Sequence, residues 1–145
     1  MVYGVYVRLM VTIGNKKPPS QDYRLTVTSP KNVIIPEYKI TIFESKRSGV
    51  RLFASKIRRG SQDYSEQRLN CHSKLQEVTA PRQAIRAGVD EALMLDINGS
   101  VSTCNATKFF IVRNGEVWTS TGSYCMNGVT RSEVISVCEK KEIVV

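Results

Sequence analysis

An alternation of apolar and polar residues opens the chain and predicts a β-strand over residues 3–13. The apolar residues on one side of this strand are Val5, Val7, Leu9, Val11 and Ile13. Because successive side chains of a strand point to opposite faces, these residues share one face, and we expect that face to be buried. The segment therefore predicts one strand of a sheet with a covered side.

Three shorter segments, residues 23–28, 32–35 and 50–57, have the apolar and β-branched composition of strands. Pro36 follows the second of them. Because proline lacks the N–H that a sheet ladder needs, we expect that strand to end at an edge there. Residues 58–65 are charged and polar, and we expect them to form a loop.

Between residues 71 and 87 the spacing of apolar residues changes to that of a helix. The residues that recur at this spacing are Leu75, Val78, Arg82 and Ile85. Gly88 follows in the position where helices stop. Proline in a helix interior costs about 3 kcal/mol. We therefore predict a shorter helix that has Thr79 as its cap and Pro81 in its first turn.

After this helix, residues 91–95 predict a short buried strand, residues 96–99 a turn, and Val101 the start of another strand. Residues 108–113 are rich in β-branched and aromatic residues, which is typical of a strand.

A tight hairpin follows these strands. Asn114 and Gly115 both tolerate positive φ, which is the strongest short-range hairpin signal, so residues 116–119 are predicted to return as the partner strand.

A helix start follows the hairpin. Thr130 and Glu133 have the spacing of a capping box, and the helix is predicted to run to about Lys140. Free N–H groups and the helix dipole favour an anion at such a start. Gly128, Val129 and Thr130 are therefore a candidate phosphate site, and an ordinary capped helix is the alternative.

The order of elements predicts an α+β fold in which two or three helices pack on a mixed sheet. The chain has 145 residues, 41% of them apolar, which suffices for the modest core of a single domain over residues 1–145. The net charge of +8 raises the alternative of a nucleic-acid-binding module. The basic residues are scattered pairs without interleaved aromatic residues, so we expect no nucleic-acid partner.

The four cysteines are widely spaced and there is one histidine, so we expect neither a metal site nor a disulfide framework. No apolar run approaches 18 residues, and the N-terminus lacks the features of a secretory signal. These observations predict a cytoplasmic protein that does not enter a membrane. His72 is a candidate general base, but no acidic partner is placed beside it.

Several ordered motifs resemble one family. These are Tyr6 to Thr12, the stretch DEALMLD from Asp90, the stretch NATKFFIVRNGEVWT from Asn105, and NGVTR from Asn127. The whole pattern resembles the class IV aminotransferases, which use pyridoxal 5′-phosphate and include branched-chain and D-amino-acid aminotransferases. The resemblance covers the middle of a typical member, so we expect a truncated large domain with part of that family's barrel-like sheet.

The resemblance implies a pyridoxal phosphate cofactor, an amino-acid and 2-oxo-acid substrate pair, and a homodimer. It implies that Val129 and Thr130, after Gly128, hold the cofactor phosphate. It also places Thr103 where the family has a glutamate at the pyridine nitrogen, and Lys108 where the family has an asparagine.

At the position of the family's cofactor-binding lysine the chain has Asn70. The resemblance then makes Lys74, four residues on, the candidate lysine, because it would lie one helical turn away if residues 70–74 were helical. In the strand at the N-terminus, Ile13 replaces a family arginine. Two hypotheses follow: an aminotransferase acting on branched-chain or other small amino acids, or an inactive relative that serves as a scaffold for a partner.

Overall fold

The computed structural model describes residues 3–40, 47–61, 63 and 69–145. By its contacts the chain forms two compact units, Met1–Gly49 (unit 1) and Val50–Val145 (unit 2). That the whole chain acts as one domain stays a prediction.

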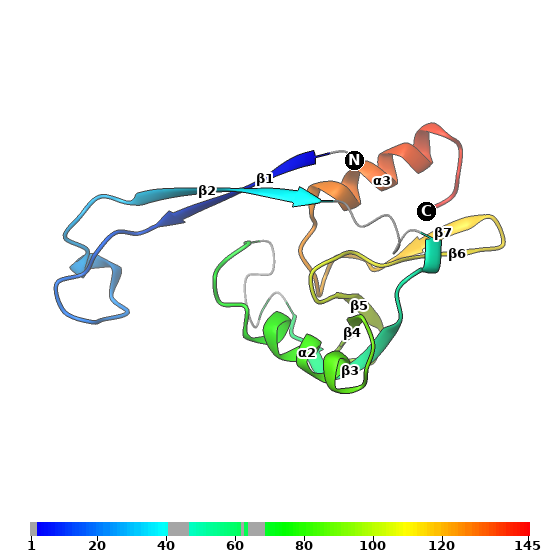
Figure 1. Ribbon diagram of the computed structural model, residues 1–145, viewed down its shortest axis with the longest axis horizontal. Helices are drawn as coiled ribbons and strands as arrows, with labels where there is room; N and C mark the ends of the chain where they lie inside the picture. The colour runs from blue at the N-terminus through cyan, green and yellow to red at the C-terminus, as the bar shows by residue number, and fades with distance from the viewer. Residues whose placement is uncertain (1–2, 41–46, 62, 64–68) are drawn as a thin grey trace. The chain divides into compact units, whose positions relative to one another are not determined.

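Unit 1 contains a long two-stranded antiparallel sheet. β1 (Tyr3–Thr12) pairs with β2 (Lys31–Ile40) in continuous register (Figure 1). The strand at the N-terminus is confirmed, but its buried face is wrong, since Leu9 is 64% and Val11 is 66% exposed. Alternation determines which residues share a face, whereas burial needs a second layer, and none covers this face among the described residues.

Two other predictions for unit 1 are also wrong. Residues 23–28 do not form a strand: they begin with the 3₁₀ turn η1 (Tyr23–Leu25), because the Asp22 carboxylate accepts the Arg24 N–H and caps the turn. β2 does not end at Pro36 but continues to Ile40. Pro36 lies opposite Val7, and a strand paired on only one side tolerates a proline whose nitrogen faces away from its partner.

The sheet of unit 2 is mixed, and this confirms the predicted α+β class. β3 (Leu52–Arg59) runs parallel to β4 (Glu91–Asp96), and β5 (Val101–Cys104) runs antiparallel to β4. α2 (Leu75–Arg86) connects β3 to β4 and packs on both (Figure 1). The strand predicted over residues 91–95 and the turn after it are confirmed.

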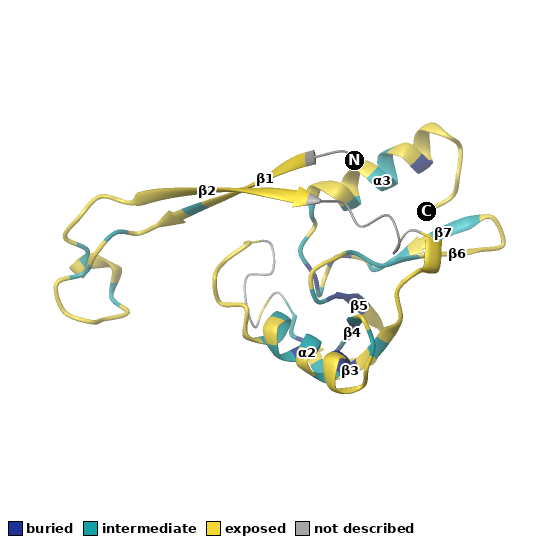
Figure 2. Cartoon of the chain, in the orientation of Figure 1, coloured by how far each residue is buried: buried dark blue, intermediate teal, exposed yellow. Residues whose placement is uncertain are grey.

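The core of unit 2 lies between α2 and β4. It consists of Ala80, Ala84, Ala92 and Met94, with Phe53, Ile57 and Val89 packed against it (Figure 2). The small alanines let the helix approach the sheet closely. The apolar residues that predicted the helix face the other way: Leu75 is 77% and Ile85 is 70% exposed. The spacing therefore predicted the helix but not its buried face.

α2 is one continuous helix, so the shorter helix capped by Thr79 is wrong. It begins at Leu75 and contains Pro81, while the Thr79 hydroxyl donates to the Leu75 carbonyl at 2.6 Å. Packing of the alanines on the sheet outweighs the hydrogen bond that proline lacks. The helix stops at Gly88, as predicted: this residue has φ +69°, and the Val89 N–H donates back to the Ala84 carbonyl.

The remaining elements of unit 2 are a hairpin and a helix. β6 (Phe110–Arg113) and β7 (Glu116–Thr119) pair as predicted, with positive φ at Asn114 and Gly115. α3 (Val129–Lys140) ends where expected.

The predicted capping box at the start of α3 is wrong. Gly128 is the N-cap residue and no side chain caps the helix, because the helix begins one residue before Thr130 and moves that hydroxyl into the first turn.

Candidate functional site

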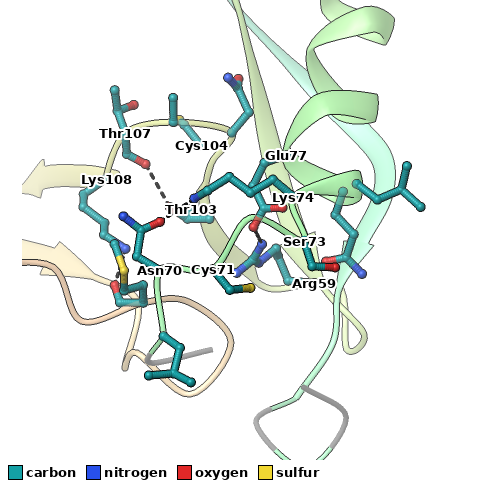
Figure 3. A pocket seen from close by; sticks show the side chains of 16 residues that line it. Arg59, Asn70, Cys71, Ser73, Lys74, Glu77, Thr103, Cys104, Thr107 and Lys108 are labelled. Carbon is teal, nitrogen blue, oxygen red and sulfur yellow. Dashed lines mark hydrogen bonds and ion pairs between the residues drawn. The ribbon is translucent and has the colours of Figure 1, made fainter. Parts of the chain in front are cut away.

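A cavity of about 440 Å³ lies within unit 2, where the end of β3, the start of α2 and the end of β5 meet (Figure 3). Its lining includes polar and charged side chains from all three elements and from the loops that follow them. Those that bear on its chemistry are Arg59, Asn70, Lys74, Glu77, Thr103, Cys104 and Lys108. We call this cavity the α2 pocket.

Three of the residues predicted from the sequence line the α2 pocket together: Asn70, Lys74 and Thr103. The Lys74 ammonium donates to Asn70 Oδ1 at 2.6 Å. Lys74 is the N-cap residue of α2, so residues 70–74 are not the helical turn that the prediction assumed. The chain turns tightly before the helix, where the Lys74 N–H donates to the His72 carbonyl at 2.9 Å.

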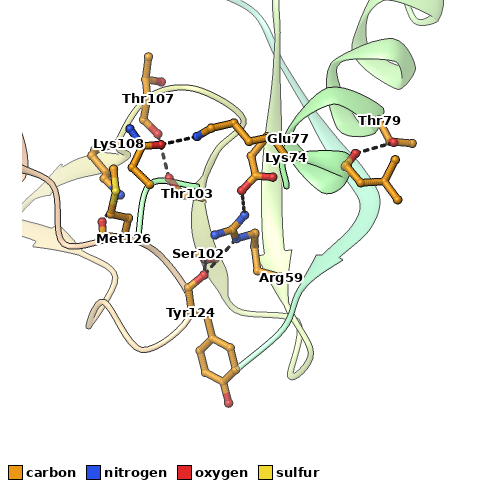
Figure 4. A network of polar contacts seen from close by, with 12 residues as sticks. Arg59, Lys74, Glu77, Thr79, Ser102, Thr103, Thr107, Lys108, Tyr124 and Met126 are labelled. Atoms are coloured by element: carbon orange, nitrogen blue, oxygen red, sulfur yellow. Dashed lines mark hydrogen bonds and ion pairs between the residues drawn. The ribbon is translucent and has the colours of Figure 1, made fainter. Parts of the chain in front are cut away.

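Thr103 is buried on β5. Its hydroxyl donates to the Thr107 carbonyl at 2.8 Å (Figure 4). The hydroxyl proton is therefore engaged, and the oxygen is left to accept a hydrogen bond without carrying a negative charge.

The predicted phosphate residues lie at the start of α3, outside the lining of the pocket. Val129 and Thr130 are exposed, and Gly128 precedes them. Gly128 nevertheless adjoins the pocket, because a Cβ at this position would lie 3.4 Å from the Lys108 Cε. The structure thus brings the start of α3 next to the Lys108 wall of the pocket.

A buried ion pair closes one side of the pocket. Arg59 on β3 binds Glu77 on α2, and the side chains are only 6% and 24% exposed. Arg59 also donates through Nε to the Tyr124 carbonyl at 3.2 Å, and that oxygen accepts the Ser102 hydroxyl as well (Figure 4). Sequence analysis missed this pair, because residues 58–65 were predicted as a loop although β3 extends through Arg59.

Lys108 forms the opposite wall. It is half-buried, and its ammonium donates to the Met126 carbonyl (Figure 4). Burial lowers the pKa of Lys108; Cys125 raises it, and the guanidinium groups of Arg59 and Arg131 lower it further. In the sequence, Lys108 stood out only because it occupies the position of a family asparagine. That difference did not reveal that Lys108 is half-buried.

The structure gives less support to a chemical role for His72 and the cysteines. His72 is exposed and does not line the pocket. Burial raises the pKa of the Cys104 thiol, and the Glu91 carboxylate raises it further, which makes Cys104 a poor nucleophile. All four cysteines are free thiols.

Among the described residues there is no cluster of side chains that could hold a metal ion, and no helix is long and apolar enough to span a membrane.

The sequence pattern of one family, amino-transferase class IV, matches residues 2–145. The chain belongs to the class IV aminotransferase family. It is 28% identical to branched-chain-amino-acid aminotransferase-like protein 2 of Arabidopsis thaliana, over 99% of the chain and 26% of that protein. The fold is similar to the branched-chain aminotransferase of Thermoproteus uzoniensis with norvaline, with TM-score 0.79 and 26% identity over 97% of the chain.

A second structure shows the same fold. It is an aminotransferase from Brucella abortus bound to the cofactor PLP, with TM-score 0.81 and 21% identity over 97% of the chain. The chain spans about a quarter of the Arabidopsis relative, 46% of the Thermoproteus chain and 49% of the Brucella chain.

Proposed function

We propose that the α2 pocket binds pyridoxal phosphate and that the chain takes part in amino-group transfer between a small amino acid, branched-chain or similar, and a 2-oxo acid. The proposal rests on a single observation. In a class IV family member, one cavity contains two lysine amines and lies beside the start of a helix.

The charges around the pocket fit a phosphate-bearing ligand. Arg59 and Lys108 line it, and Arg131 in the first turn of α3 lies close enough to lower the pKa of Lys108. Arg131 Nε is buried and has no hydrogen-bond partner among the described residues. Together with the N–H groups of Val129 and Thr130, Arg131 would hold a phosphate at the helix start.

The residues fit the ring of the cofactor less well. When bound, pyridoxal phosphate supplies a conjugated ring that withdraws electrons from the substrate Cα. Thr103 can accept a hydrogen bond from the pyridine nitrogen only when that nitrogen is protonated, and it has no negative charge to keep the nitrogen in that form. The pocket lysines would hold or move a proton at Nζ, and Lys74 stays the lysine predicted for this role from the resemblance.

Binding of pyridoxal phosphate with slow turnover is therefore the expected behaviour. Titration followed by absorbance measures the binding, and an amino-transfer assay with leucine and a 2-oxo acid measures the turnover. Saturable binding that inorganic phosphate competes away, together with measurable amino transfer, would support the proposal. Failure to bind would contradict it.

A second candidate function is a scaffold that binds the cofactor or a partner without chemistry. Asn70 and Thr103 favour it, because they replace the residues that in this family bond the cofactor and hold its ring protonated. Saturable binding without any amino transfer would support this second function.

We also propose that the chain forms a homodimer, as the family resemblance implies. The exposed apolar side of β1 supports this proposal, because such patches are uncommon on monomers. Sedimentation velocity tests the oligomeric state.

A cytoplasmic location is likewise a proposal, supported by the four free thiols.

A further inference from the structure

Two lysine amines line the α2 pocket, and they differ in their surroundings. Lys74 is exposed, and its ammonium is hydrogen-bonded to the Asn70 side chain. Lys108 is half-buried and donates to a backbone carbonyl, that of Met126. Among the described residues Lys108 makes no ion pair with a carboxylate.

The charged groups that face Lys108 come from each element around it. Arg59 approaches from β3 and Arg131 from α3, and both are cationic. Glu77, a carboxylate in the pocket lining, is already bound by Arg59. Cys125 raises the pKa of Lys108, and the Met126 carbonyl accepts a hydrogen bond from its ammonium. A lysine surrounded in this way releases its proton more readily than a lysine in water.

We propose that Lys108, rather than Lys74, is the lysine that bonds covalently to an aldehyde held in the α2 pocket. This inference rests on the proposed function, because the aldehyde is that of a phosphate-bearing cofactor. The phosphate would lie at the start of α3, which adjoins the Lys108 side chain at Gly128.

The bonding step needs no oxidant or reductant. The unprotonated Nζ adds its electron pair to the aldehyde carbon, and one of its two protons is transferred to the carbonyl oxygen. The second amine proton then leaves with that hydroxyl group as water, and a carbon–nitrogen double bond replaces the carbon–oxygen one. A lysine with a lowered pKa supplies the unprotonated Nζ near neutral pH.

The decisive measurement is made on the unaltered 145-residue chain. The chain is incubated with pyridoxal phosphate and reduced with borohydride, and the modified lysine is found by peptide mass. We expect one label per chain at Lys108, suppressed by inorganic phosphate and formed at a lower pH than the label on free lysine. Equilibrium dialysis of the unreduced chain measures cofactor binding separately.

Two matched variants accompany this experiment. K108M should lose the label, and K74M should keep it, with circular dichroism confirming that both are folded. A label at Lys74 that survives in K108M would overturn the inference but leave the proposed function standing, as would cofactor binding with neither lysine labelled. No binding, with labels spread thinly over surface lysines, would overturn both.

Discussion

Single residues determine the charge of the α2 pocket, and the most consequential of them is buried. Arg59 has a side chain only 6% exposed, and Glu77 is its carboxylate partner. The attraction between two buried charges offsets their desolvation only while both are present. Loss of one partner leaves an uncompensated charge in the fold.

We therefore expect E77Q to destabilise the chain by about 2 kcal/mol, below the ~3–5 kcal/mol of a fully buried pair, because glutamine keeps an acceptor oxygen. Urea unfolding measures the loss. The matched control is D22N, which breaks the exposed pair between Arg24 and Asp22 and should leave stability unchanged. If E77Q and D22N lower the unfolding free energy equally, the burial of Arg59 does not strengthen its ion pair with Glu77.

Lys108 should make stability depend on pH. Its pKa is lowered in the folded chain, so between that pKa and the ordinary value of about 10.4 the unfolded chain binds more protons than the folded one. Stability attributable to Lys108 therefore rises with pH in this window. Unfolding free energies of the unaltered chain and of K108M should diverge in favour of the unaltered chain as pH rises. A constant difference would contradict the lowered pKa.

At the scale of elements, local rules predicted most of what the structure shows. The alternation before residue 13, the helical spacing around Leu75 and the Asn114–Gly115 turn each found the right element. What they did not find was the buried side, because Ala80 and Ala84 carry no strong apolar signal. Burial depends on which layer an element meets, and that information is not local.

The same limit applies to the candidate site. Asn70, Lys74 and Thr103 were predicted from a motif and do share one pocket. Arg59 and Lys108 were not predicted as site residues, since their importance comes from burial that only the packed sheet creates. A family motif shows which residues of this chain occupy the family's site positions. It does not show how the packing and charge around those residues change when several of them differ from the family.

Pro81 gives the test at this scale. P81A should stabilise the chain by about 2 kcal/mol, because alanine restores a helix hydrogen bond worth more than the chain entropy that proline saves. Thermal unfolding measures the gain, and P18A, in an exposed bend, is the control and should bring none. A loss of stability in P81A would indicate that the helix begins near Pro81 instead.

At the scale of the whole molecule, both units expose apolar side chains. Leu9 and Val11 lie on β1 in unit 1, and Leu75 and Ile85 lie on α2 in unit 2. Large exposed apolar surfaces generally mark places where another surface binds. The two units offer different candidates for self-association.

We expect L9K to shift the chain toward smaller species in sedimentation velocity, with little change in unfolding free energy, because Leu9 is already exposed. I85K is the matched change on α2 and should leave the sedimentation of the chain unaltered. If I85K reduces association and L9K does not, association runs through the helix, and the role given to β1 is wrong.

The central position of β4 has a consequence for the dynamics of the pocket. β4 pairs with β3 on one side and β5 on the other, and these neighbours carry Arg59 and Thr103 to the pocket walls. Amide protons that bond β4 to its neighbours exchange with solvent only when the sheet opens as a cooperative unit. A ligand that holds the two walls together should therefore slow deuterium uptake along a strand that it never touches.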